Sequence, residues 1–198
     1  MKYYNIKKAI FMDRPNRFLA KVRIDGIEEI VHVKNTGRCK EILIPGTTVY
    51  LEKSSNPARK TKYSLISAYK GEKLINIDSQ SPNAVIFESL KNGEIDEIGE
   101  IFTIKREVTF GDSRFDIYFE NQIGKGFIEI KGATLENEGV VMFPDAPTER
   151  GRKHVLEMIK AVKDGYMGFI LFLIQMKGVK SFTPNAATDP EFAEAIRL

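Results

Sequence analysis

Two carboxylates and one lysine stand in neighbouring apolar runs of this 198-residue sequence, spaced so that they could act on one metal ion. Asp116 lies in residues 114–118, and Glu129 and Lys131 lie in residues 127–131. Side chains two apart on a strand share a face, so Glu129 and Lys131 point the same way. The turn-rich link NQIGKG between the runs suits a hairpin, which would bring Asp116 beside Glu129. The sequence therefore predicts two carboxylates and one ammonium group at the end of a sheet.

These side chains have a shared chemical use. Carboxylates are the hard oxygen ligands that Mg²⁺ or Mn²⁺ prefers, and such an ion lowers the pKa of a bound water and neutralises charge at a scissile phosphodiester. A lysine beside them can position the attacking water or stabilise the charged transition state. An acid, then acid-x-Lys, on adjacent strands is the arrangement of the PD-(D/E)xK nuclease core. We expect Asp116, Glu129 and Lys131 to be catalytic, with Asp116 and Glu129 as metal ligands.

The alternative for the same residues is a solvated sheet face, where a Glu and a Lys pair only weakly. Three observations favour a site. The alternation of Ile128 and Ile130 with charged residues predicts a buried opposite face, an acid stands at hairpin distance upstream, and a basic helix follows. Glu88, on a short helix ahead of these strands, could add a third carboxylate, although a solvated helix face is the simpler interpretation.

A basic segment, residues 149–154, opens the longest predicted helix. Arg150 and His154 are four residues apart and share a face of that helix. Cations at a helix start, with the free backbone N–H groups found there, suit a phosphate. We expect Glu149, Arg150 and His154 to bind nucleic acid, together with Arg114. The alternatives are a solvated first turn and a histidine that is simply hydrogen-bonded.

Two polar clusters, RPNR and KNTGRCK, lie in the first part of the chain. Loops of a small barrel that carry Arg and Asn commonly grip a phosphate backbone. We therefore expect Asn16, Arg17, Asn35 and Arg38 to contact nucleic acid. The alternative for residues 35–37 is a simple turn.

The first part of the chain is also rich in short strand-like runs separated by Gly, Pro, Asn and Asp. The runs are residues 6–12, 18–24, 28–33, 48–52 and 63–69. They predict a small all-β unit, with Asp25-Gly26 as the best hairpin signal and residues 14–16 as another turn. A polar stretch at residues 78–83 predicts a boundary between this all-β unit, a barrel or a sandwich, at residues 1–80 and a second domain at residues 81–198.

The second part alternates between strand and helix patterns. Short helices are expected at residues 84–90 and 190–197, and a longer one at residues 148–163 with apolar side chains near 3.6-residue spacing. Strands are expected at residues 102–109, 114–120, 126–131 and 169–175. This order predicts an α+β or α/β unit with a mixed sheet.

Composition sets wide limits on function. The net charge of +3, from 30 basic and 27 acidic residues, is too small to indicate a nucleic-acid binder by itself. Cys39 is the only cysteine, which excludes an internal disulfide and a cysteine-rich zinc site. The N-terminus lacks a signal-peptide pattern, and the longest apolar stretch, residues 169–174, is far short of a membrane span. We expect a cytoplasmic protein with no membrane partner.

The sequence resembles the sugar fermentation stimulation protein A (SfsA) family over almost its whole length. The shared blocks, in family order, are RPNRFLAKV, HVKNTGR, EVTFGDSRFDIYF, GFIEIKGATL, MFPDAPTERGRKH and the late FLIQM with TDPEF. The resemblance implies an N-terminal OB-like barrel followed by a PD-(D/E)xK (restriction-endonuclease-like) domain, and a DNA-binding protein with a nuclease site. Members often have Cys-Pro before the NTG turn, where this chain has Val33-Lys34, and many continue well beyond the TDPEF block.

The resemblance also assigns positions. It implies that the acid and E-x-K positions are those named above, and that the TERG-x-x-H block and the N-terminal blocks contain the expected nucleic-acid contacts. The favoured function is Mg²⁺- or Mn²⁺-dependent phosphodiester hydrolysis of DNA, with RNA as an alternative substrate and a homodimer as one option. The rivals are a non-catalytic DNA-binding regulator of sugar-metabolism genes on a vestigial nuclease fold and, less favoured, an RNA- or oligosaccharide-binding barrel.

Overall fold

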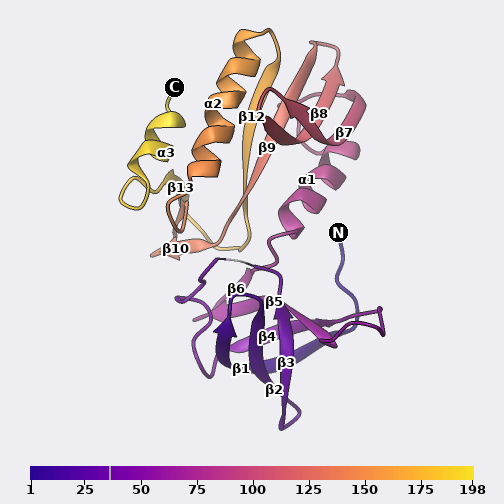
Figure 1. Cartoon of the computed structure of the whole chain (residues 1–198), viewed down its shortest axis with the longest axis vertical. Helices are drawn as coiled ribbons and strands as arrows, with labels where there is room; N and C mark the ends of the chain where they lie inside the picture. Colours follow the sequence, from indigo (N-terminus) through magenta and orange to yellow (C-terminus); the bar gives the residue numbers. More distant parts are fainter. Residues whose placement is uncertain (36) are drawn as a thin grey trace. The chain divides into compact units, whose positions relative to one another are not determined.

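A closed five-stranded barrel forms the first part of the protein in this computed structural model, which describes residues 1–35 and 37–198 (Figure 1). The five barrel strands are β1 (Ile6–Asn16), β2 (Leu19–Ile24), β3 (Ile27–Val33), β4 (Thr48–Lys53) and β5 (Tyr63–Lys70), and the short β6 (Lys73–Asn76) extends the sheet beyond β5. They form one sheet in the order β3-β2-β1-β4-β5-β6, and a parallel pairing of β3 with β5 closes the barrel. The predicted OB-like barrel is confirmed.

Alternating side chains explain why these segments form a barrel. In β2 the residues Ala20, Val22 and Ile24 are buried inside, whereas their neighbours are more exposed. The predicted Asp25-Gly26 hairpin is confirmed, because β2 and β3 pair antiparallel directly across it. Asp25 and Gly26 have φ of 49° and 85°, and a two-residue turn with both φ positive matches the twist of the flanking strands. The alternation and the turn residues together determine the register of this hairpin.

The turn predicted at residues 14–16 is wrong. Arg14 to Asn16 belong to β1, and the chain reverses at Arg17 and Phe18 instead. Pro15 is tolerated in the strand because the β1–β2 register shifts between Asp13 and Asn16, so its missing N–H removes no ladder bond. The second predicted turn, residues 35–37, includes Thr36, which lies outside the described residues.

A four-stranded mixed sheet with flanking helices forms most of the second part. Its order is β12-β9-β8-β7, and β7, β8 and β9 pair antiparallel. The bounds are α1 (Ser81–Lys91), β7 (Ile101–Phe110), β8 (Ser113–Asn121), β9 (Lys125–Ala133), α2 (Glu149–Lys163), β12 (Met167–Ile174) and α3 (Pro190–Ala195). Each corresponds to a predicted element, within a few residues at the ends.

Alternate residues of β9 contact different helices. Ile128 and Ile130 lie in a cluster with the apolar side chains of α1, whereas Phe127 packs with Met158 of α2. Since neighbouring side chains of a strand point to opposite faces, α1 and α2 cover the two faces of the sheet. Figure 1 shows α2, in orange, running along β9 and β12. The face under α2 is the one that Glu129 shares with Phe127.

Four short strands were not expected from the sequence. One is β6, and the others are β10 (Leu135–Asn137), β11 (Val140–Phe143) and β13 (Ser181–Pro184), which form a sheet in the order β10-β11-β13. The chain divides into two compact units. The first contains Met1–Ser81, Thr134–Val141 and Ile174–Ser181, and the second contains Pro82–Ala133, Met142–Leu173 and Phe182–Leu198. The predicted boundary after residue 80 stays a prediction.

Ion pairs and hydrogen bonds attach the late segments of the first unit to its barrel. Glu136, on β10, has a buried side chain that accepts hydrogen bonds from the ammonium groups of Lys70 and Lys73 and from the backbone N–H of Gly139. Gln175 likewise donates to the backbone oxygen of Asn76 at 3.0 Å. Throughout residues 1–35 and 37–198, no helix has the length and apolar character needed to cross a membrane.

Candidate metal and nucleic-acid site

Asp116 lies where the β8–β9 ladder ends. The paired register runs as far as Ile117 and Ile128, and Asp116 is the next residue of β8. There its carboxylate takes the place of the ladder, because Oδ2 accepts a hydrogen bond from the backbone N–H of Ile130 at 2.8 Å. Oδ1 accepts from Nδ2 of Asn83, on α1, at 2.7 Å. The side chain is therefore fixed by one contact from each of two elements.

Glu129 is buried, and only one of its two carboxylate oxygens has hydrogen-bond partners. Its residue exposure is 3%. Oε1 accepts from Nζ of Lys131 at 2.6 Å and lies 2.5 Å from Nδ1 of His154. Oε2 is buried without a hydrogen-bond partner. A buried unpaired carboxylate oxygen is costly, so this atom needs a cation or a water to complete its surroundings.

The negative charge of Glu129 also acts on the Asp116 carboxyl. Burial raises the pKa of the Asp116 carboxyl above its ordinary value, and the negative charge of Glu129 raises this pKa further. The hydrogen bonds from Ile130 and Asn83 and the charge of Lys131 act in the opposite direction and do not cancel the increase. A divalent cation beside these two carboxylates would stabilise the ionised form of Asp116.

The start of α2 is fixed by its own cap and by α3. Thr148 precedes the helix, and its Oγ1 accepts from the N–H of Gly151 at 3.0 Å. Asp189, the N-cap of α3, accepts from the N–H of Thr148 at 2.8 Å. A Cβ at Gly151 would lie 2.8 Å from the Thr148 side chain, so the cap needs glycine there. These contacts set the register that directs His154 toward the sheet.

The structure brings together four of the residues that the sequence singled out: Asp116, Glu129, Lys131 and His154. It separates His154 from its predicted neighbour, since His154 is buried against Glu129 whereas Arg150 is exposed. Sequence reasoning missed Asn83, which lies in the polar stretch interpreted as a boundary. Its amide has no motif to reveal it, because its role depends on how α1 packs against the sheet.

The remaining predicted residues of this unit lie on the surface. Glu149 is exposed at the first position of α2. Arg114, also exposed, has its guanidinium 3.6 Å from the Glu107 carboxylate. A cation and an anion pairing at this exposure contribute little to stability.

In the barrel, Arg14 organises the loops that carry the predicted contacts. Its guanidinium donates to four backbone oxygens, those of Arg17, Asn35, Gly37 and Arg38, at 2.6–2.8 Å. Both predicted asparagines have local bonds of their own. The side chain of Asn16 accepts from the N–H groups of Phe18 and Leu19, and that of Asn35 bonds to Ile77 and Gly37. Arg17 and Arg38 are exposed.

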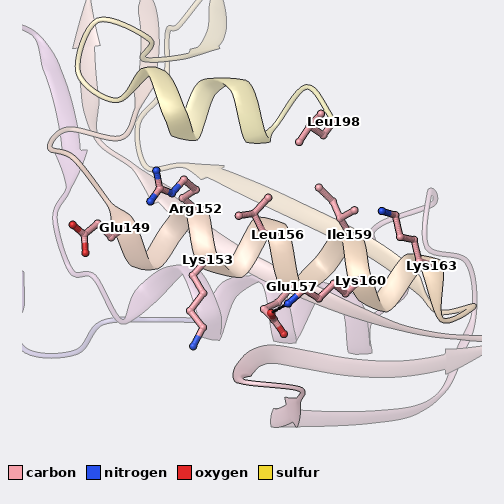
Figure 2. Close-up of a pocket in the computed structure, with 9 residues that line it drawn as sticks. All are labelled: Glu149, Arg152, Lys153, Leu156, Glu157, Ile159, Lys160, Lys163 and Leu198. Atoms are coloured by element: carbon pink, nitrogen blue, oxygen red, sulfur yellow. Dashed lines mark hydrogen bonds and ion pairs between the residues drawn. The ribbon is translucent and has the colours of Figure 1, made fainter.

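A hollow on the second unit lies away from the carboxylate pair. It has a volume of about 620 Å³ and lies along the outer side of α2, where Leu156 and Ile159 point toward Leu198 (Figure 2). It shares no residue with the carboxylate pair, and Glu149 is the only predicted site residue on its lining. We therefore place the candidate site at the carboxylate pair and not in this hollow.

The donor set fits a hard divalent ion. Asp116 and the free Oε2 of Glu129 supply carboxylate oxygens, the ligands that Mg²⁺, Mn²⁺ and Ca²⁺ prefer. Among the residues that the structure describes, no group of three or more His, Cys, Asp or Glu side chains could hold a metal ion. Two carboxylates are the usual protein share for Mg²⁺, which keeps several of its waters. The chemistry therefore fits a partly hydrated ion and does not fit zinc.

Two family models match the chain. The model described as "SfsA N-terminal OB domain" matches residues 12–77, and that described as "Sugar fermentation stimulation protein RE domain" matches residues 80–198. A sugar fermentation stimulation protein homolog from Alkaliphilus oremlandii is 60% identical over 203 residues, covering 100% of this chain and 86% of the relative. The homolog from Ruminiclostridium cellulolyticum is 53% identical, with the same coverage of both.

A solved structure is similar over the whole chain. It is the SfsA of Pyrococcus furiosus in complex with Ca²⁺, which is 32% identical, with a TM-score of 0.90. The match covers 100% of this chain and 84% of the archaeal one.

Proposed function

The chain belongs to the sugar fermentation stimulation protein family, and we propose that it hydrolyses phosphodiester bonds of DNA with the help of a divalent cation, Mg²⁺ or Mn²⁺, in a PD-(D/E)xK domain. The observation that carries the proposal is the buried, unpartnered Oε2 of Glu129 beside the carboxylate of Asp116. The Ca²⁺ bound by the archaeal relative supports a divalent cation in the family.

Each site residue has a distinct role in this proposal. Asp116 and Oε2 of Glu129 hold the cation, which when bound lowers the pKa of a water and neutralises charge on the phosphate. Nζ of Lys131 donates one hydrogen bond to Glu129 and has two further donors. One of these can orient the attacking water or contact a phosphate oxygen, where charge grows in the transition state.

Each unit has exposed cations that could contact a DNA backbone. Arg17 and Arg38 project from the loops that Arg14 ties together, and Arg150 and Arg114 are exposed on the second unit. Each phosphate contact of this kind releases counterions, so DNA affinity should fall steeply as salt rises. We also propose that residues 1–80 and 81–198 divide these tasks between binding and cleavage.

The test is cleavage of single-stranded, duplex and branched DNA, and of RNA, with Mg²⁺ or Mn²⁺. We expect Lys131→Met to abolish cleavage while circular dichroism shows a folded protein. Lys125→Met is the matched control, because Lys125 lies on the same strand with its ammonium over the Tyr166 ring, and this variant should cleave normally. If the wild-type protein cuts none of these substrates with either ion, the enzyme proposal fails.

A non-catalytic DNA-binding regulator is the second candidate. It is favoured by the absence, among the described residues, of a third side-chain ligand and by the engagement of Lys131 with Glu129. DNA binding that needs no cation and survives Glu129→Ala, together with absent cleavage, would support it. Loss of DNA cleavage but not of DNA binding in Glu129→Ala would support the enzyme.

A further inference from the structure

We infer that His154 is a positioning residue: it holds Oε1 of Glu129 so that Oε2 is the single oxygen presented to the cation. The inference rests on the proposed cation site. From the sequence we expected His154 to contact a phosphate, whereas here we infer that it positions Glu129.

The contact between the two side chains is short and enclosed. Nδ1 of His154 lies 2.5 Å from Oε1 of Glu129, and the exposed fractions of the two side chains are 7% and 4%. A hydrogen bond to an ionised group that water does not reach is stronger and more directional than one at the surface. The Nδ1 atom is therefore engaged by protein and is not available to a phosphate.

Packing fixes the orientation of the imidazole ring. The rings of His154 and Phe115 form a T-shaped pair with a centroid distance of 6.2 Å and an interplanar angle of 79°, and Phe115 is fully buried. The capped start of α2, described above, fixes the backbone from which the ring projects. The backbone of His154 and its imidazole ring are thus both fixed by packing, as is required of a residue that positions another group.

Both hydrogen-bond donors to the Glu129 carboxylate contact Oε1, so Oε2 is the oxygen available to a cation. Lys131 and His154 both point to Oε1, from β9 and from α2 respectively. Oε2 has no partner. The carboxylate is therefore oriented as a ligand through one oxygen. Without His154, only the flexible ammonium of Lys131 would restrain it, and the carboxylate could rotate away from Asp116.

The test compares two replacements of similar size on the full-length chain. The side-chain nitrogen of asparagine stands at the same number of bonds from Cβ as Nδ1, whereas that of glutamine reaches the distance of Nε2. With isothermal titration of Ca²⁺ and of Mn²⁺, we expect His154→Gln to bind about 10–100-fold more weakly. His154→Asn should retain affinity to within about tenfold of the wild type. If His154 only filled space, the two variants would bind these cations with equal affinity, and that result would overturn the inference.

Failure of the inference can be told apart from failure of the proposed function. If the wild type binds Ca²⁺ and His154→Gln binds it equally well, the positioning role is wrong and the cation site stands. If the wild type binds no Ca²⁺, Mg²⁺ or Mn²⁺, both are wrong.

A measurement on the wild type guards against variants that do not fold. The chain has two histidines, so ¹⁵N-histidine labelling gives two ring systems, with His32 in the other unit as the internal control. Adding Ca²⁺ should move the Nδ1 signal of His154 and leave His32 unchanged. If Ca²⁺ binds and the His154 signal stays in place, the inference is refuted.

Discussion

Replacing Arg14 should destabilise the barrel far more than replacing either neighbouring arginine. Its guanidinium donates to the backbone oxygens of Asn35 and Gly37, which are partly buried, and to those of Arg17 and Arg38, which are exposed. Hydrogen bonds from a charged group are worth about 1.5–3 kcal/mol when partly buried. The exposed ones exchange with water and contribute less.

The expected loss follows from these four contacts. Counting about 1.5 kcal/mol for each partly buried bond, and a few tenths for each exposed one, Arg14→Ala should lower the free energy of unfolding by roughly 3–4 kcal/mol. That is a large share of the roughly 5–15 kcal/mol typical of a folded domain. Arg14→Lys should recover less than half of it, because an ammonium cannot reach four oxygens in the plane of a guanidinium.

Urea denaturation followed by circular dichroism measures this loss, with Arg17→Ala and Arg38→Ala as charge-matched controls. Both controls should unfold within about 0.5 kcal/mol of the wild type, as surface substitutions do. They should, however, weaken DNA binding and flatten its salt dependence. An Arg14→Ala protein as stable as the Arg17→Ala protein would refute the structural role argued for Arg14.

Two further predictions concern carboxylates whose pKa values are shifted in opposite directions. The hydrogen bond from Lys73, with further help from Gly139 and Lys70, lowers the pKa of Glu136 to about 2, so its contribution to stability is present above pH 4.5 and is lost as the pH falls toward 2. Glu136→Gln should lower the free energy of unfolding by about 2 kcal/mol at pH 7, and its free energy of unfolding should change less between pH 4.5 and 2 than that of the wild type. Urea titrations at several pH values measure both effects, and a pH dependence equal to that of the wild type would contradict the prediction. Asp116 is the opposite case: its raised pKa means that ionisation destabilises the metal-free fold as the pH rises. Asp116→Asn should therefore leave the metal-free protein at least as stable at pH 8 by thermal melting, but Ca²⁺ should no longer raise its Tm, and a retained Ca²⁺ shift would show that Asp116 is not a ligand.

Local patterns explain what could be predicted from the sequence. The Asp25-Gly26 hairpin needed only the turn residues and the alternation on each side, both of which lie within a few positions of each other. The E-x-K spacing at Glu129 and Lys131 likewise places both side chains on one face of a strand whatever surrounds it. Such features are encoded over short stretches, so no tertiary information is needed to find them.

Contacts between distant segments account for what was missed. Asn83 bonds to Asp116 across 33 positions, and His154 turns inward to Glu129 across 25. Helix periodicity placed His154 beside Arg150 but could not say that its ring would be enclosed. The role of Arg14 was hidden for a similar reason, because backbone oxygens, its partners, leave no trace in the sequence.

The division of the chain has a consequence for its biosynthesis. The first unit includes Thr134–Val141 and Ile174–Ser181, so it lacks part of itself until residue 181 has been made. An emerging barrel would carry Lys70 and Lys73 without the carboxylate of Glu136, which forms ion pairs with both. The first unit is therefore complete only after most of the second unit, including the carboxylate pair, has been synthesised. Residues 1–80 made alone would lack both late segments, so we expect this fragment to be less stable than the complete first unit.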